Sequence, residues 1–135
     1  MLYLLHGIGG DEEEWRRGAH PEAILDNLIA DQRIRPIAMA LLPAASRWRN
    51  LEYACSDGTL LWPDQIILPL ARENLNLLDI KRYPGSYGVL GASLGGTMSF
   101  YTGLRMPDVF GNALSQSGAF MTESRDFAVV DLVKH

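Results

Sequence analysis

Ser93 lies in the segment Gly91-Ala-Ser-Leu-Gly95, which matches the pattern G-x-S-x-G. A serine hydroxyl held on a sharp turn between a strand and a helix can attack a carbonyl carbon and form an acyl intermediate. The preceding residues 88–92 are small or apolar, and a helical pattern opens at Gly95, so the sequence supplies that strand, turn and helix. Glycines on both sides leave room for a strained backbone. We therefore expect Ser93 to be a nucleophile.

Two other interpretations of the glycine-rich segments fail on the residues present. A phosphate-binding loop needs a lysine before a serine or threonine, but Gly96 is followed by Thr97 and Met98. A dinucleotide-binding fingerprint that begins at Gly7 would need glycine where the chain has Glu12. A structural glycine-rich turn with an idle serine stays open as the alternative to a catalytic Ser93.

Acyl transfer by a serine also needs two hydrogen-bond donors for the developing oxyanion. One is expected to be the backbone N–H of Leu94, the residue after the nucleophile. The second is expected from the loop His6-Gly-Ile-Gly-Gly10, which follows an apolar run and has the glycines needed to direct an N–H. Its candidate donors are Ile8 and Gly9. His6 is expected to order this loop by hydrogen bonding, with a role as general base as the weaker alternative.

The elements that must position these residues alternate along the chain. Strands are predicted over residues 2–5, 36–42, 87–92 and 112–116. Helices are predicted from Pro21 onward and over 64–78, 95–105 and 123–134; residues 44–63 are predicted to be a long loop, and the acids 11–14 a solvated loop or a first helical turn. This alternation indicates an α/β fold with about four mostly parallel strands and flanking helices.

Two segments together, Tyr3-Leu-Leu-His-Gly-Ile-Gly-Gly10 and Gly88-Val-Leu-Gly-Ala-Ser-Leu-Gly-Gly96, resemble the esterase family of α/β hydrolases. That family includes enterochelin esterases, feruloyl esterases and S-formylglutathione hydrolases. The stretches Trp15-Arg-Arg-Gly-Ala-His-Pro21 and Leu114-Ser-Gln-Ser-Gly-Ala-Phe120 look like the same family, nearest its enterochelin-esterase-like members. The resemblance covers almost the whole chain.

The resemblance implies serine-dependent ester hydrolysis without cofactor or metal. Ser93 would be the nucleophile, and the N–H groups of Leu94 and Ile8 would form the oxyanion hole. It also implies an α/β-hydrolase core. We interpret residues 1–135 as a single partial domain of that fold, truncated at both ends.

The chain departs from the family pattern in its acid and its histidine. In this fold both follow the serine, the acid first, but the only histidine after Ser93 is His135. The acids after the serine are Asp108, Glu123, Asp126 and Asp131, and the family pattern puts none of these residues at a triad position. The candidate bases are His135, His6 and, last, His20. Without a working base the activity is expected to be weak, so an inactive remnant that acts as an assembly or binding module is the rival hypothesis.

Composition sets further bounds. The chain has 135 residues with a formal net charge of −4, which gives no electrostatic reason to expect nucleic acid or an anionic membrane as partner. No apolar run approaches the length of a membrane span. The single cysteine, Cys55, cannot form an internal disulfide and is expected to be an ordinary free thiol in the cytoplasm. A small-molecule ester is the expected substrate, and a homo-oligomer is expected to cover the apolar faces that truncation leaves.

Overall fold

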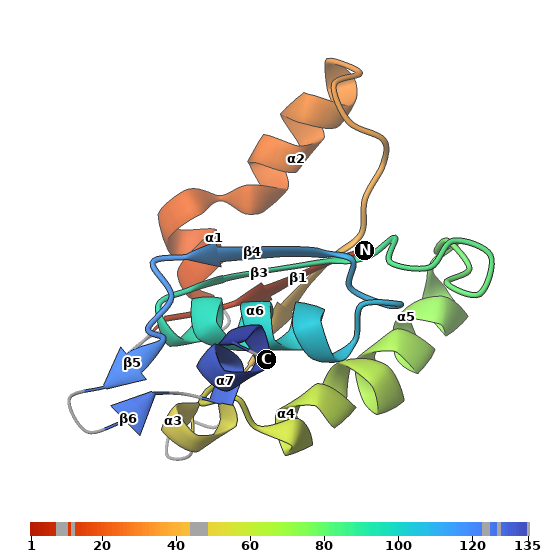
Figure 1. Ribbon diagram of the computed structural model, residues 1–135. Helices are drawn as coiled ribbons and strands as arrows, with labels where there is room; N and C mark the ends of the chain where they lie inside the picture. Colours follow the sequence, from red (N-terminus) through yellow and green to blue (C-terminus); the bar gives the residue numbers. More distant parts are fainter. Residues whose placement is uncertain (8–10, 12, 44–48, 123–124, 127, 135) are drawn as a thin grey trace.

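The centre of the protein is a four-stranded parallel sheet, seen in a computed structural model that describes residues 1–7, 11, 13–43, 49–122, 125–126 and 128–134 (Figure 1). The strands are β1 (Leu2–Leu5), β2 (Met39–Leu42), β3 (Gly88–Ala92) and β4 (Asn112–Gln116). Their order in space is β2-β1-β3-β4, and every neighbouring pair is parallel. The α/β fold with four parallel strands is therefore confirmed.

The helices of the described residues lie on both sides of this sheet (Figure 1). They are α1 (Glu14–Ala19), α2 (Pro21–Ala30), α3 (Arg49–Glu52), α4 (Asp57–Trp62), the π-helical turn η1 (Pro63–Ile67), α5 (Leu68–Asn74), α6 (Leu94–Arg105) and α7 (Ala128–Lys134). The helices α1 and α2 lie on one side, and α6 lies against β1, β3 and β4 on the other. A short antiparallel pair, β5 (Met121–Thr122) and β6 (Arg125–Asp126), follows β4.

The strand order places β1 and β3 side by side at the centre, with β2 beyond one and β4 beyond the other. Leu5 at the end of β1 pairs with Leu42 of β2 and Gly91 of β3, so the carboxyl ends of these strands share one edge. From β1 the chain goes on to β2, its neighbour on one side, whereas from β3 it goes on to β4, on the opposite side. The carboxyl ends of β1 and β3 therefore form a topological switch point. In open α/β sheets such a point is where ligands bind. Gly7, just after β1, and Ser93, just after β3, lie next to each other there.

The core fills the space between the sheet and α6. Tyr3, Val89, Met98 and Phe110 are almost fully buried, and the rings of Tyr3 and Phe110 lie 5.0 Å apart. The buried tyrosines keep their hydroxyl groups hydrogen-bonded, since the Tyr3 hydroxyl donates to the Pro63 carbonyl oxygen at 3.4 Å. Tyr3, Leu4 and Leu5 are all buried, so β1 is covered on both of its faces.

Two predictions between β2 and β3 are wrong. Residues 44–63, predicted to be a loop, contain α3 and α4, which bury Leu60. The predicted helix 64–78 ends at Asn74, and Leu75 is extended. The first part of the predicted helix is η1, in which the Leu68 N–H bonds to the Pro63 carbonyl across five residues rather than four. That extra residue turns the helix face by about 100°, so Leu70 is 57% exposed while Leu68 is fully buried.

The C-terminal prediction is also partly wrong. Residues 123–134 were expected to form one helix, but Arg125–Asp126 belong to a strand pair and the helix α7 begins only at Ala128. Strand 112–116 matches β4, and the helix predicted over 95–105 begins one residue earlier, at Leu94. The predicted strand 36–42 is confirmed only for Met39–Leu42.

One side of the molecule is thinly covered. The helix expected from Pro21 is present as α2, but it contains no buried residue, and Ile24 is 51% exposed. Leu114 on the edge strand β4 is 58% exposed. The sheet therefore presents apolar side chains and an unpaired edge within the described residues.

Candidate active site

Ser93 occupies a strained turn between β3 and α6. Its backbone has φ 53° and ψ −121°, a combination that a residue with a side chain rarely adopts. Such a conformation costs on the order of 1–3 kcal/mol and is found where the surrounding structure imposes it. The sharp turn that the sequence pattern predicts is therefore present, with a half-buried Ser93 at its apex.

The glycines around Ser93 are required by close backbone contacts. A Cβ on Gly91 would collide with the carbonyl group of Gly95. A Cβ on Gly95 would lie 2.5 Å from the carbonyl oxygens of both Leu5 and His6. Because β1 and the first turn of α6 approach this closely, the end of β1 is brought next to the serine.

The backbone of Ser93 is held by the segment that follows β4. The Ser93 N–H donates to the Gln116 carbonyl oxygen at 2.9 Å, and the Ser93 carbonyl accepts the Ala119 N–H at 3.3 Å. The same carbonyl accepts the N–H of Thr97 at 3.0 Å, the usual bond of a first helical turn. Three backbone hydrogen bonds, with Gln116, Ala119 and Thr97, thus fix the strained residue, which explains how the fold maintains it.

The segment after β1 lies on the other side of the serine. Gly7 is buried, and a Cβ placed on it would lie 3.5 Å from the Ser93 Cβ. Nδ1 of His6 lies 3.0 Å from the Gly7 carbonyl oxygen, and because a carbonyl oxygen only accepts, Nδ1 is the donor. The Gly7 N–H donates to Oε2 of Glu14 at 3.3 Å.

His6 itself is almost fully buried. Its side chain is 1% exposed, and its ring lies 5.4 Å from the Tyr53 ring. Among the described residues, Nε2 has no hydrogen-bond partner. The contact with Gly7 agrees with the predicted ordering role, whereas the described part of the chain contains no hydrogen bond between His6 and the Ser93 hydroxyl.

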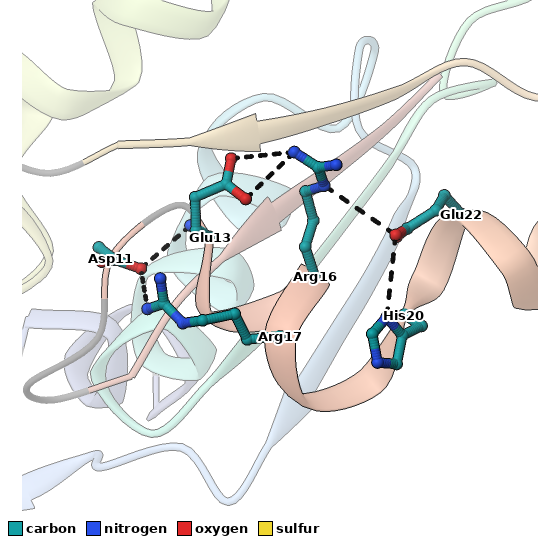
Figure 2. A network of polar contacts seen from close by, with 6 residues as sticks. All are labelled: Asp11, Glu13, Arg16, Arg17, His20 and Glu22. Atoms are coloured by element: carbon teal, nitrogen blue, oxygen red, sulfur yellow. Dashed lines mark hydrogen bonds and ion pairs between the residues drawn. The ribbon is translucent and has the colours of Figure 1, made fainter.

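A polar network on the surface joins the loop after β1 to α1 and α2 (Figure 2). Arg17 bonds Asp11 at 2.6 Å, and Arg16 bonds Glu13 at 3.1 Å. His20, where α1 meets α2, lies 4.0 Å from Glu22 and is mostly exposed. His20 is thus engaged on the outer surface, which agrees with its last place among the candidate bases.

Several predicted site residues lie outside the described part of the chain. These are Ile8, Gly9, Glu123 and His135, together with the acid Glu12. Leu94 is described and begins α6 directly after the serine. Asp108 and Asp131 are exposed. In the portion of the chain that the structure describes, no side chain hydrogen-bonds the Ser93 hydroxyl.

Two contributions to the site were missed in the sequence. Gln116 and Ala119 hold the serine backbone, and the predicted adjacency of parallel strands 87–92 and 112–116 was the signal that could have located them. Glu14 was assigned to a solvated acidic run, and no pattern in that run distinguishes it from Glu13. Its contact with Gly7 depends on how α1 is placed.

The described residues hold neither a metal-binding cluster nor a membrane-spanning helix. They contain no group of three or more His, Cys, Asp or Glu side chains placed to hold a metal ion. None of their helices combines the length and apolar character needed to cross a bilayer.

Known proteins resemble the chain in sequence. The iron(III) enterobactin esterase of Escherichia coli is 31% identical over 111 residues, which cover 82% of the chain and 27% of that protein. An endo-1,4-beta-xylanase/feruloyl esterase of Xylanibacter ruminicola is 27% identical over 128 residues, covering 91% of the chain and 17% of that protein. The chain therefore spans less than a third of the length of these curated relatives.

Solved structures resemble the fold. The enterobactin esterase of Shigella flexneri, crystallised in the presence of enterobactin, superposes with a TM-score of 0.82 at 27% identity and covers 98% of the chain and 33% of its own. A ferulic acid esterase of Anaeromyces mucronatus superposes at 0.72 with 18% identity, covering 93% of the chain and 50% of its own, and shows the fold alone. The four parallel strands and their helices are a fragment of the α/β-hydrolase fold. The family model described as "Putative esterase" matches residues 1–126, and the chain belongs to this esterase family.

Proposed function

We propose that the protein is a serine carboxylic-ester hydrolase that acts on short acyl esters. The observation that carries this proposal is the strained backbone of Ser93, whose φ of 53° is combined with a ψ of −121°, outside the left-handed helical region, where β3 meets α6. A fold has little reason to maintain that strain for packing alone, because glycine would adopt a positive φ at lower cost. A strained serine at the switch-point edge of the sheet suits a nucleophile whose hydroxyl must be presented to substrate.

In the proposed reaction, the Ser93 hydroxyl oxygen bonds to the ester carbonyl carbon while its proton passes to a base. The carbonyl oxygen becomes an oxyanion that the N–H groups of Leu94 and of Ile8 or Gly9 stabilise. The N-terminus of α6, a helix of 12 residues, adds a favourable field for this negative charge. Collapse of the intermediate expels the alcohol, and water then hydrolyses the acyl-serine by the same steps. No metal or cofactor takes part in this scheme.

The base is proposed to be His135 or His6. A serine without its base is a weak nucleophile, and an oxyanion hole alone leaves roughly 10³–10⁴-fold acceleration over water. A chain that lacks a working imidazole would therefore be a slow esterase. Single His6→Ala, His20→Ala and His135→Ala variants assign the base, because only the variant that loses it should fall to the rate of the oxyanion hole alone.

The test is hydrolysis of p-nitrophenyl acetate by wild type and Ser93→Ala. Ser56→Ala is the matched control, since Ser56 precedes α4 and makes no side-chain cap there. We expect Ser93→Ala to lose the enzymatic rate and Ser56→Ala to keep it; equal rates in all three proteins would refute the proposal. Methyl ferulate should be assayed in parallel, because the relatives are named for feruloyl and enterobactin esters.

The rival proposal is a catalytically inactive remnant that serves as an assembly or binding module. It is favoured by one observation, that no described side chain hydrogen-bonds the Ser93 hydroxyl. A fluorophosphonate probe followed by mass spectrometry separates the two proposals. Adduct formation at Ser93 supports the esterase, whereas an unlabelled but cooperatively folding protein supports the module.

We further propose that the chain forms a homo-oligomer through the exposed apolar side of the sheet. Leu114 on the edge strand β4 is 58% exposed, and residues 112–116 contain no charge to discourage pairing with another strand. Light scattering should give a mass above that of one chain for wild type and a lower mass for Leu114→Lys. A monomeric wild type at micromolar concentration would refute this.

The proposed location is the cytoplasm, where a lone thiol such as Cys55 stays reduced. Cell fractionation followed by antibody detection tests it, and recovery outside the cytoplasmic fraction would contradict it.

A further inference from the structure

We propose that Glu14 is a positioning residue of the active site, whose carboxylate holds the loop after β1 by accepting the Gly7 N–H. The proposal rests on the proposed function, since it concerns the loop that carries the second oxyanion donor. Glu14 touches neither substrate nor Ser93 in this scheme. It acts through Gly7, the residue that lies against the serine.

Both polar groups of Gly7 are occupied. Its N–H donates to Oε2 of Glu14 at 3.3 Å, and its carbonyl oxygen lies 3.0 Å from Nδ1 of His6. The N–H belongs to the peptide group before Gly7 and the carbonyl to the peptide group after it, so the two bonds restrain the planes on both sides of Gly7. Because Gly7 is buried and a Cβ built on it would lie 3.5 Å from the Ser93 Cβ, a rotation of this residue would alter the surroundings of the nucleophile.

The bond to Glu14 also limits which backbone N–H groups can stabilise the oxyanion. An N–H that is already bonded to a carboxylate is not free to stabilise an oxyanion, so Gly7 is removed from the set of possible donors. That leaves Leu94 and the residues after Gly7 for this role.

Helix α1 holds the backbone of Glu14 in place. The Glu14 N–H donates to the Asp11 carbonyl oxygen at 3.1 Å, and Asp11 is bonded to Arg17 at 2.6 Å (Figure 2). Glu13, the neighbouring acid, bonds Arg16 and not the β1 segment. Among the described acids that precede or open α1, Glu14 alone bonds Gly7, so the two adjacent glutamates differ in function.

Glu14→Ala, Glu14→Gln and Glu13→Ala together test the assignment. We expect Glu14→Ala to lower kcat for p-nitrophenyl acetate about tenfold, which corresponds to about 1.4 kcal/mol of transition-state stabilisation, with little change in KM. Glu14→Gln keeps an oxygen acceptor and should recover most of this loss. Glu13→Ala should stay within about twofold of wild type, as expected for an exposed ion pair. Equal losses in Glu13→Ala and Glu14→Ala, or no loss in Glu14→Ala, would overturn the proposal.

A second measurement does not depend on activity. Hydrogen exchange at the Gly7 amide should be slow in wild type and Glu14→Gln and clearly faster in Glu14→Ala, at unchanged midpoint of urea unfolding. Similar exchange in wild type and Glu14→Ala refutes the positioning role even if the esterase assay succeeds. If exchange behaves as expected but Ser93 takes no phosphonate label, the proposed function fails and Glu14 is shown to hold the loop without serving catalysis.

Discussion

Replacing Gly95 by alanine tests whether the close approach of β1 and α6 builds the turn at Ser93. The new Cβ would lie 2.5 Å from the backbone oxygens of Leu5 and His6. Ordinary van der Waals contact begins near 3.4 Å, so β1 and α6 would have to separate by about 0.9 Å. Neither oxygen belongs to a flexible side chain that could move aside, and the movement would separate Ser93 from Gly7.

The expected cost follows from that displacement. Overpacking a well-packed core typically costs about 1–3 kcal/mol, and we expect Gly95→Ala to fall at the upper end because two backbone oxygens are hit at once. Gly96→Ala should cost less, since its Cβ would meet the Ser115 hydroxyl oxygen at 2.9 Å, on a side chain that can rotate. Its nearest backbone oxygens, those of Gln116 and Gly91, lie at 3.1 Å rather than 2.5 Å. The order of destabilisation is thus Gly95→Ala above Gly96→Ala.

Urea unfolding followed by fluorescence measures the effect, and Gly18→Ala is the matched control. Gly18 lies within α1, and nothing is within 4 Å of its Cβ position. Alanine there should stabilise the protein by up to about 1 kcal/mol through helix propensity. An unfolding midpoint for Gly95→Ala equal to that of wild type would refute the packing argument. If Gly95→Ala does not fold, Gly96→Ala still tests the packing argument, because a higher unfolding midpoint for Gly96→Ala than for wild type would also refute it.

Three further predictions concern buried polar groups. Burial, with a hydrogen bond to Asp57, raises the pKa of Tyr101 to about 12, above its ordinary value of 10.0. The stability that depends on the neutral hydroxyl is therefore complete below pH 10.0 and falls as the pH rises toward 12. Urea midpoints between about pH 9 and 11 should fall less in Tyr101→Phe than in wild type, and equal slopes would contradict this. Burial raises the pKa of the Cys55 thiol, so DTNB should react slowly with the native protein and rapidly in denaturing urea; rapid native reaction would show that the thiol is accessible. Ser99→Ala, which removes a buried hydroxyl 2.9 Å from the Leu114 carbonyl oxygen, should lower the free energy of unfolding by about 1 kcal/mol, and an unchanged value would mean that the bond contributes nothing.

The strands were predictable because their signals are local. Residues 88–92 carry small or apolar side chains and residues 112–116 are uncharged; both lie between turn residues, and the structure places β3 and β4 there. The turn at Ser93 was predictable for the same reason, since glycine is required at positions 91 and 95, where the backbone contacts leave no room for a side chain.

The errors have non-local causes. The π-turn at Pro63–Ile67 changes the phase of the apolar pattern, and periodicity alone cannot detect an added residue in a helix. The bond between Gly7 and Glu14 depends on where α1 lies in space. Likewise, the bonds from Gln116 and Ala119 to Ser93 follow from the strand order rather than from any motif.

The contacts around Ser93 join parts of the chain that are far apart in sequence: Gly7, Gln116 and Ala119 all meet the residue between β3 and α6. A folding intermediate in which any one of these segments is still undocked would lack the strained conformer. Ester turnover during refolding should consequently be the last property to recover and should rise in step with complete assembly. The proposed ester turnover would then measure complete folding, because every partly ordered state would be inactive.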